Sequence, residues 1–150
     1  MNKNKFIIRV YAIIIENNNI LISDEYQLNM KMTKFPGGGL EFGEGPIDCI
    51  KRECLEEFGQ EIEVIEHFYT TDFYQKALFY EDSQLISIYY LVKFKNKIVF
   101  KISDKPFDFN ELKNGNQSFR WEKINNISEN DITFPIDKLV LTKLKKNLPK

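Results

Sequence analysis

Cysteine and histidine are scarce in this chain of 150 residues, which contains two cysteines and one histidine. Cys49 and Cys54 lie five positions apart on an expected helix, where their side chains point about 140° apart and cannot join in a disulfide. His67 has no second histidine and no cysteine cluster beside it, which argues against a zinc site. Without a disulfide framework, we expect the protein in a reducing compartment, the cytoplasm.

A strong net charge and a long apolar run are also missing. The formal net charge is -1, so no basic field would attract a nucleic-acid duplex. No stretch approaches the roughly 18 apolar residues of a membrane span. The apolar segment Phe6–Ile15 is interrupted by Arg9 and has no small-residue cleavage site after it, so we expect a buried strand rather than a signal peptide. These absences favour a small ligand over a duplex or a membrane.

The length and the hydrophobic patterning predict one domain over residues 1–150, of the α/β or α+β class. A helix is expected at Pro46–Phe58, where Pro46 suits a first turn and Gly59 a left-handed cap. A second helix is expected at Ile136–Leu148, and a polar loop at Ser103–Ser118. The expected strands are Phe6–Ile15 and Ile20–Ile22, joined by an Asn17–Asn19 turn, then Thr33–Phe35, Ile62–Tyr69, Leu85–Phe94, Ile98–Ile102 and Phe119–Ile124.

The first predicted helix has two different faces. Its expected buried stripe is Ile47, Ile50, Cys54 and Phe58, which are spaced three and four residues apart. A separate face carries Glu53, Glu56 and Glu57. Three carboxylates on one patch repel one another by a few tenths of a kcal/mol for each close pair. Such a patch is useful where a cation binds, so the pattern predicts a divalent metal site.

Six of the seven glycines lie between Gly37 and Gly59, which indicates tight turns or a close approach of the backbone to a ligand. A P-loop is excluded, because Gly38 and Gly43 have its spacing but Glu44 stands at the lysine position. A dinucleotide-binding fingerprint also fails, since its third glycine is missing. Carboxylates hold a phosphate only through a bridging cation, typically Mg²⁺.

The segment from Gly38 to Gln60 resembles the Nudix box. Every invariant polar and glycine position of that signature is filled. Gly38 is followed after five residues by Glu44, and after seven more residues by Arg52-Glu53-Cys54-x-Glu56-Glu57-x-Gly59. Two apolar positions depart from the family pattern, since they hold Cys54 and the polar Gln60. Neither departure touches an expected ligand. The resemblance implies a Nudix-type α/β/α sandwich with a mixed central β-sheet.

The same resemblance implies hydrolysis of a nucleoside diphosphate linked to another moiety, with Mg²⁺ or Mn²⁺ as cofactor. By this likeness Glu53, Glu56, Glu57 and the carbonyl of Gly37 are expected to bind the metal ion. Arg52 and Glu44 are expected to fix the geometry of the carboxylates. Either Glu53 or Glu57 is the expected general base. Because many relatives are homodimers, a homodimer is also possible here.

Residues beyond the metal set are expected to meet the substrate. Gly38 and Gly39 are expected to approach it with their backbone, and Tyr74, Tyr80 and Trp121 lie on or near loops where they could stack on a base. Core or rim packing is the competing interpretation for these aromatic side chains. A further acid often comes from a later loop in the family, and the candidates here are Glu81, Asp82, Asp108 and Glu111.

The substrate is not determined by the residues. By elimination, a nucleoside triphosphate, canonical or oxidised, is favoured over a nucleotide sugar. An alternative from another class is a non-catalytic nucleotide-sensing domain, but such domains usually lose a box carboxylate or the arginine, and all are present here. A prenyl diphosphate isomerase would need a catalytic cysteine on a strand, whereas both cysteines fall on the predicted helix.

Overall fold

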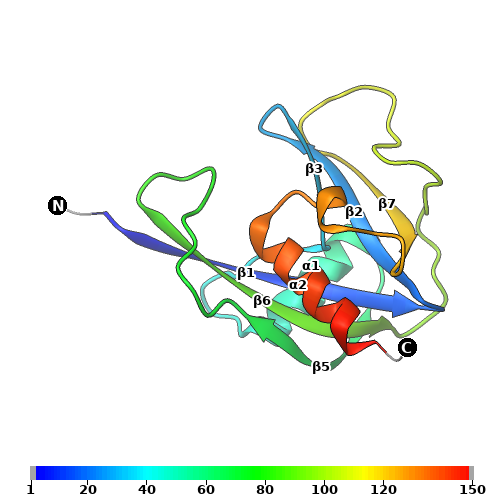
Figure 1. The fold of residues 1–150 in the computed structure, drawn as a ribbon, viewed down its shortest axis with the longest axis horizontal. Helices are drawn as coiled ribbons and strands as arrows, with labels where there is room; N and C mark the ends of the chain where they lie inside the picture. Colours follow the sequence, from blue (N-terminus) through cyan, green and yellow to red (C-terminus); the bar gives the residue numbers. More distant parts are fainter. Residues whose placement is uncertain (1–2, 149–150) are drawn as a thin grey trace. The chain divides into compact units, whose positions relative to one another are not determined.

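The computed structural model describes residues 3–148. Over that range the fold is of the mixed α+β class, with a mixed central sheet and two α-helices, which confirms the predicted class (Figure 1). In chain order the elements are β1 (Lys5–Glu16), β2 (Asn19–Gln27), β3 (Met30–Lys34), β4 (Gly37–Gly39), α1 (Pro46–Phe58), β5 (Ile62–Thr70), β6 (Ser83–Phe94), β7 (Asn116–Lys123), the 3₁₀-helix η1 (Glu129–Asp131) and α2 (Pro135–Asn147). Among residues 3–148, no helix is long and apolar enough to cross a membrane.

The chain forms two compact units by its internal contacts. One unit contains residues 3–13 and Gly37–Ile98, and the other contains Ile14–Pro36 and residues 99–148. This division does not test whether the chain is one domain, so that expectation stays a prediction.

The first unit is built on β1, β4, β5 and β6. β4 pairs antiparallel with β1, so that Val10 faces Gly38 and Tyr11 faces Gly37. β5 pairs antiparallel with β6, and β6 is also the neighbour of β1. The arrows of β1 and β6 point the same way in Figure 1, which accounts for the mixed character of the sheet.

Helix α1 begins and ends where the sequence predicts. Pro46 takes a first-turn position, and the N–H of Gly45 donates to the Asp48 carboxylate at 3.0 Å. At the other end Gly59 has φ +67°, and its N–H donates to the carbonyl of Leu55. A left-handed residue at this place satisfies a carbonyl that the helix itself leaves without a donor. The Phe58 ring meets the edge of Phe94 on β6, with centroids 5.3 Å apart, so the helix packs on this sheet.

The predicted buried stripe of α1 is wrong at one position. Ile50, Cys54 and Phe58 are buried as expected, but Ile47 is 44% exposed and Cys49 is fully buried in its place. The reason is the glycine-rich loop, because the carbonyl of Gly39 lies 3.5 Å from the Cys49 sulfur. In the first turn of α1, the side chain that is buried is therefore the one covered by the glycine-rich loop, and helical periodicity alone does not predict that contact.

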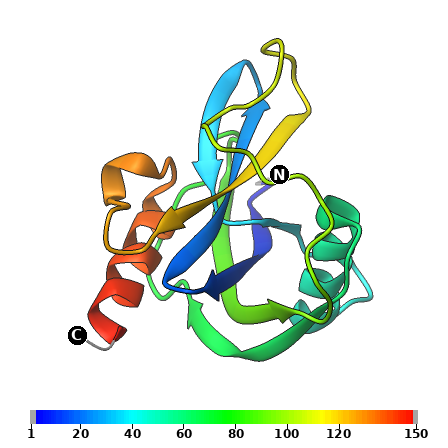
Figure 2. The same ribbon diagram turned by 90° about the vertical axis from the view of Figure 1, so that its right-hand side faces the viewer.

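The second unit contains β2, β3, β7, η1 and α2. Asn17 and Asn18 have φ of 50° and 63° in the predicted turn between β1 and β2. β2 lies between β3 and β7 and pairs antiparallel with both, as Figure 2 shows. Helix α2, predicted at Ile136–Leu148, buries an apolar stripe made of Ile136, Val140, Leu141 and Leu144.

Two strand predictions need correction. The third strand runs over Met30–Lys34 rather than Thr33–Phe35, because a second positive-φ turn at Leu28 and Asn29 starts it earlier. No strand forms at Ile98–Ile102, where Val99 is 82% exposed. Phe100 instead meets the edge of the Phe119 ring at 5.7 Å. Side-chain packing has overridden the β-branched composition of this segment.

Candidate active site

Strand β4 brings the backbone of the glycine-rich loop against β1. Gly37 has φ +154°, and a Cβ there would lie 2.1 Å from the carbonyl oxygen of Val10, so no other residue fits. A Cβ on Gly38 would lie 2.3 Å from the carboxylate carbon of Glu53. The missing side chain at Gly38 is therefore the space that the Glu53 carboxylate fills.

Arg52 is the centre of the site. Its Nε donates to Glu44 at 3.0 Å and its Nη2 donates to the other oxygen of Glu44 at 2.7 Å, a bidentate pair. Nη2 also donates to the carbonyl of Gly39 at 3.0 Å. Nη1 donates to Glu53 at 2.9 Å and to Glu56 at 3.3 Å. One guanidinium thus joins the loop, through Glu44 and Gly39, to the carboxylates of α1.

Glu44 is held as an anion by these contacts. Its pKa is lowered to about 2, chiefly by the hydrogen bonds from Arg52 and next by the backbone N–H of Glu41. The pKa of Arg52 is raised in turn, with the hydrogen bond to Glu44 as the main cause. Both groups stay charged at any ordinary pH, as two residues that hold a fixed geometry require.

Cys49 lies beneath this ion pair. Its sulfur is 3.5 Å from the Gly39 carbonyl oxygen and 3.7 Å from Arg52 Nη2. Burial, and then the hydrogen bond to Glu44, raise the pKa of the thiol to about 12. The thiol therefore remains protonated and can act as a weak donor to the loop, not as a nucleophile.

The structure adds two residues to the site that the sequence did not point to. Besides Cys49, the carboxylate of Glu41 lies 3.8 Å from Arg52 Nη1. Glu41 is three residues before Glu44 in the loop, and the backbone N–H of Glu41 donates to Glu44. That turn could be suspected from the spacing, but which way Glu41 points depends on where Arg52 lies.

The carboxylates fit a hard divalent cation by their chemistry, although they are not arranged as a ready-made ligand set. Within residues 3–148, no three His, Cys, Asp or Glu side chains form a group that could hold a metal ion as they stand. Glu53 and Glu56 are both turned toward the guanidinium of Arg52. Glu57 is half-buried, with one carboxylate oxygen buried. Oxygen-only donors next to a glycine cradle are what Mg²⁺ or Mn²⁺ needs.

The structure brings part of the predicted site together. One set of predicted site residues is connected by direct contacts: Gly38, Gly39, Glu44, Arg52, Glu53 and Glu56. Gly37 and Glu57 are the chain neighbours of Gly38 and Glu56. The contacts of this set do not include the three aromatic candidates. Tyr74 and Tyr80 are exposed on the loop between β5 and β6, and Trp121 is half-buried on β7 in the other unit.

The four candidates for a further acid have other surroundings. Glu81 and Asp82 lie on the exposed loop before β6, where the Asp82 carbonyl accepts from the N–H of Lys5. Asp108 forms ion pairs with Lys101 and Lys105, at 3.4 and 3.7 Å. Glu111 is exposed in the loop before β7. None of these observations assigns a catalytic role, so that role stays a prediction.

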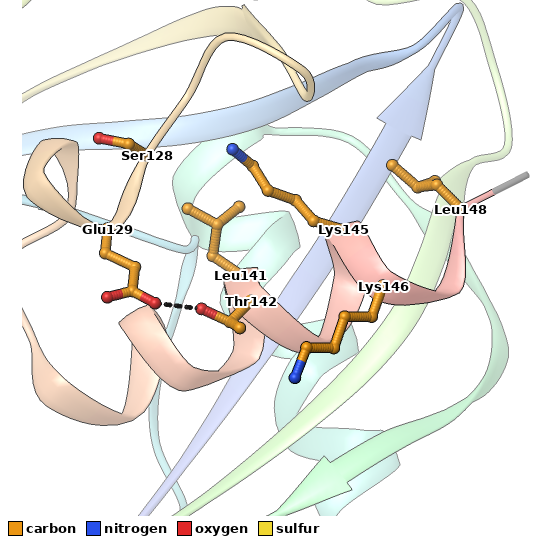
Figure 3. Close-up of a pocket in the computed structure, with 7 residues that line it drawn as sticks. All are labelled: Ser128, Glu129, Leu141, Thr142, Lys145, Lys146 and Leu148. Atoms are coloured by element: carbon orange, nitrogen blue, oxygen red, sulfur yellow. Dashed lines mark hydrogen bonds between the residues drawn. The ribbon is translucent and has the colours of Figure 1, made fainter. Parts of the chain in front are cut away.

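A pocket in the second unit has a different character. It has a volume of about 590 Å³ and lies between η1 and the C-terminal half of α2 (Figure 3). Glu129 and Thr142 are hydrogen-bonded across it, and Lys145 and Lys146 stand on its rim. It contains none of the predicted site residues, and two lysines on an open apolar surface do not define a ligand.

The family model for the NUDIX domain matches residues 5–142, most of the chain. The chain belongs to this family. The match confirms the predicted resemblance, and the protein is a hydrolase of the Nudix type. No curated protein matches the chain in sequence.

Solved structures support the same fold. The ORF135 protein of E. coli is similar over 97% of this chain and 93% of its own, with a TM-score of 0.71 and 19% identity. A MutT Nudix hydrolase from Burkholderia pseudomallei is similar over 93% of this chain and 98% of its own, with a TM-score of 0.70 and 13% identity. An ADP-ribose pyrophosphatase from Streptococcus suis matches over 96% of each chain, with a TM-score of 0.58 and 14% identity. At these identities the likeness establishes the fold and does not assign a substrate.

Proposed function

We propose that this Nudix hydrolase is a Mg²⁺- or Mn²⁺-dependent pyrophosphohydrolase that acts on a nucleotide-derived diphosphate. The observation that carries the proposal is the charge around Arg52, where one guanidinium faces Glu41, Glu44, Glu53 and Glu56. The excess of negative charge repels a phosphate unless a cation joins the two. A bound divalent cation would supply the charge that neutralises the pyrophosphate oxygens during hydrolysis.

The residues have separate tasks in this proposal. Glu53, Glu56, Glu57 and the Gly37 carbonyl would hold the cation. Arg52 and Glu44 keep the loop and the helix in register, because their bidentate pair spans both. Either Glu53 or Glu57 would accept the proton of the attacking water.

The sheet beside the site offers an apolar surface for the rest of the substrate. Side chains on a strand alternate between faces, so Phe6, Ile8 and Val10 lie on the same face of β1. This is the face of Glu53, because Val10 pairs with Gly38 and a Cβ on Gly38 would point at the Glu53 carboxylate. Phe6 is 69% exposed and Ile8 is half-buried. On β6 the face that meets α1 through Phe94 also contains the half-buried Ile86 and Ile88. An apolar strip beside a phosphate site suits a nucleobase.

The finer assignments remain proposals. We favour a nucleoside triphosphate, canonical or oxidised, as the substrate, and the similar structures named MutT fit this preference. The similarity to an ADP-ribose pyrophosphatase keeps a nucleoside diphosphate derivative as the alternative. Both cysteines are free and buried, which suits the reducing cytoplasm. A homodimer, and the absence of duplex and membrane partners, are expectations of the same kind.

A panel of nucleotides incubated with Mg²⁺ tests the proposal, with phosphate, pyrophosphate and monophosphate measured as products. On the best substrate, Glu57→Gln should lower kcat by about 10²–10³-fold, with an unchanged circular dichroism spectrum. Glu63→Gln, the same change on an exposed residue of β5, is the matched control and should keep full activity. Full activity of Glu57→Gln, or binding of nucleotide without any product, would reject the proposal, and the second result would indicate a sensor.

A further inference from the structure

The guanidinium of Arg52 has a half that is firmly anchored. Nε and Nη2 make three hydrogen bonds of 2.7–3.0 Å, two to Glu44 and one to the Gly39 carbonyl. The Glu44 side chain is only 14% exposed. A bidentate, largely buried pair of this kind is geometrically rigid. This half of the guanidinium has no reason to move when a ligand binds.

The other half is shared among several partners. Nη1 lies 2.9 Å from Glu53, 3.3 Å from Glu56 and 3.8 Å from Glu41. Its two hydrogens cannot serve three carboxylates equally well. The distances rank the partners, with Glu53 the strongest and Glu56 the next.

Glu53 and Glu56 differ in their freedom to leave Arg52. The Glu53 side chain is 15% exposed, and its carboxylate is packed against Gly38. The Glu56 side chain is 59% exposed, and its two contacts with Nη1 are 3.3 and 3.4 Å long. An exposed pair with long hydrogen bonds contributes little and is screened by solvent. Of these two helix carboxylates, only Glu56 can leave Arg52 at small cost.

We propose that Glu56 is an exchangeable arm, held by Arg52 Nη1 in the cation-free protein and released to the cation when the site is loaded. Glu44 and Glu53 keep their bonds to Arg52 throughout. Arg52 thus acts as a positioning residue that offsets the repulsion among the α1 carboxylates before a cation is present. The inference rests on the proposed metal dependence and adds the order in which the ligands assemble.

Side-chain NMR of the arginines tests the exchange directly. The chain has three arginines, Arg9, Arg52 and Arg120, so single Arg→Lys variants assign each guanidinium signal. The protein is titrated with Mg²⁺ alone, at a low temperature where rotation of the Nη groups is slow. We expect the Arg52 Nη1 signals and the Glu56 carboxyl carbon to shift, while the Arg52 Nε–H and the Glu44 carboxyl carbon stay in place. Arg120, in the other unit, should not respond.

Two variants with the same loss of charge separate the arm from its neighbours. Glu56→Gln should give, without Mg²⁺, Arg52 Nη1 signals close to those of the Mg²⁺-loaded wild type, and should lose the further response. Glu41→Gln, also beside Nη1, should keep the response. Both side chains are exposed, so neither variant should unfold the protein.

The possible failures are distinguishable. If the amides of Gly37 and Gly38 shift with Mg²⁺ but Arg52 Nη1 and Glu56 do not, the exchange is wrong and metal binding stands. A shift of the Glu44 carboxyl equal to that of Glu56 would also overturn it, since the whole guanidinium would then move. If no box residue responds to Mg²⁺, the proposed function fails, and the exchange fails with it.

Discussion

Among residues 3–148, Arg120 and Arg52 each form a cluster with carboxylates, one cluster in each compact unit, and the two clusters differ in composition and exposure. Arg120 donates to the fully buried Asp24 through Nε at 2.6 Å and through Nη2 at 3.3 Å, and to Glu122. Asp24 also accepts from the Thr33 hydroxyl and from the N–H of Phe107. Arg120 and Asp24 are both buried and each has several hydrogen-bond partners, as expected of a buried structural ion pair.

The Arg52 cluster uses the same chemistry with a different balance. One guanidinium faces four carboxylates, of which Glu41 and Glu56 are largely exposed. An exposed excess of negative charge does not stabilise the folded state. The simplest explanation for these extra carboxylates is that they bind a cation. From this comparison we propose that the number and the exposure of the carboxylates, rather than the presence of an ion pair, distinguish a candidate functional site from a structural ion pair.

The largest expected effects come from removing each arginine. Arg120→Met leaves Asp24 charged and buried without its main partner, which should lower the free energy of unfolding by about 3–5 kcal/mol. Arg52→Met should be less destabilising, because two of the four Arg52 partners, Glu41 and Glu56, are largely exposed and exposed ion pairs contribute about 1 kcal/mol or less each. The same variant should abolish most of the turnover. Urea unfolding and hydrolysis assays on both variants check this. Equal losses of stability in the two variants would mean that both clusters have a structural role.

A smaller effect is expected from filling the cradle of Glu53. Gly38→Ala places a methyl group within 2.3 Å of the Glu53 carboxylate, and a displacement of about 1 Å in a catalytic site can cost roughly 10²-fold in rate. Gly45→Ala is the matched control in the same loop, since its Cβ would meet the nearest atom at an ordinary 3.4 Å. Turnover measurements decide, and equal activity of the two variants would show that Glu53 need not lie against Gly38.

The smallest expected effect is a pH dependence that belongs to the Arg52 cluster. The pKa of Glu44 is lowered from 4.5 to about 2, so the ionised carboxylate favours the folded state. Its contribution is complete above about pH 4.5 and is lost as the pH falls toward 2. The difference in Tm between wild type and Glu44→Gln should therefore be constant from neutral pH down to about 4.5 and shrink below it. A difference that is independent of pH would contradict the assignment.

The local parts of the fold and the site were predictable from the sequence. Helix α1 has the predicted bounds, because Pro46 starts the helix and Gly59 ends it through local backbone preferences that involve only neighbouring residues. The contacts of Arg52 with Glu44 and Glu53 were expected from the resemblance to the Nudix box, whose loop and helix are contiguous in the chain.

The remaining parts depend on contacts between distant segments. Asp24 and Arg120 are 96 positions apart, and nothing in either segment indicates that the other will meet it. The burial of Cys49 in place of Ile47 depends on how the glycine-rich loop crosses the helix. The strand expected at Ile98–Ile102 failed for the same reason, because ring packing against Phe119 decides its conformation.

The most direct test of the account is the binding of Mn²⁺ to the free protein, followed by calorimetry and by the electron paramagnetic resonance of the ion. The account predicts specific binding by wild type and by Glu63→Gln, and much weaker binding by Glu57→Gln. Absence of binding in wild type even with nucleotide present, or equal affinity in all three proteins, would contradict it.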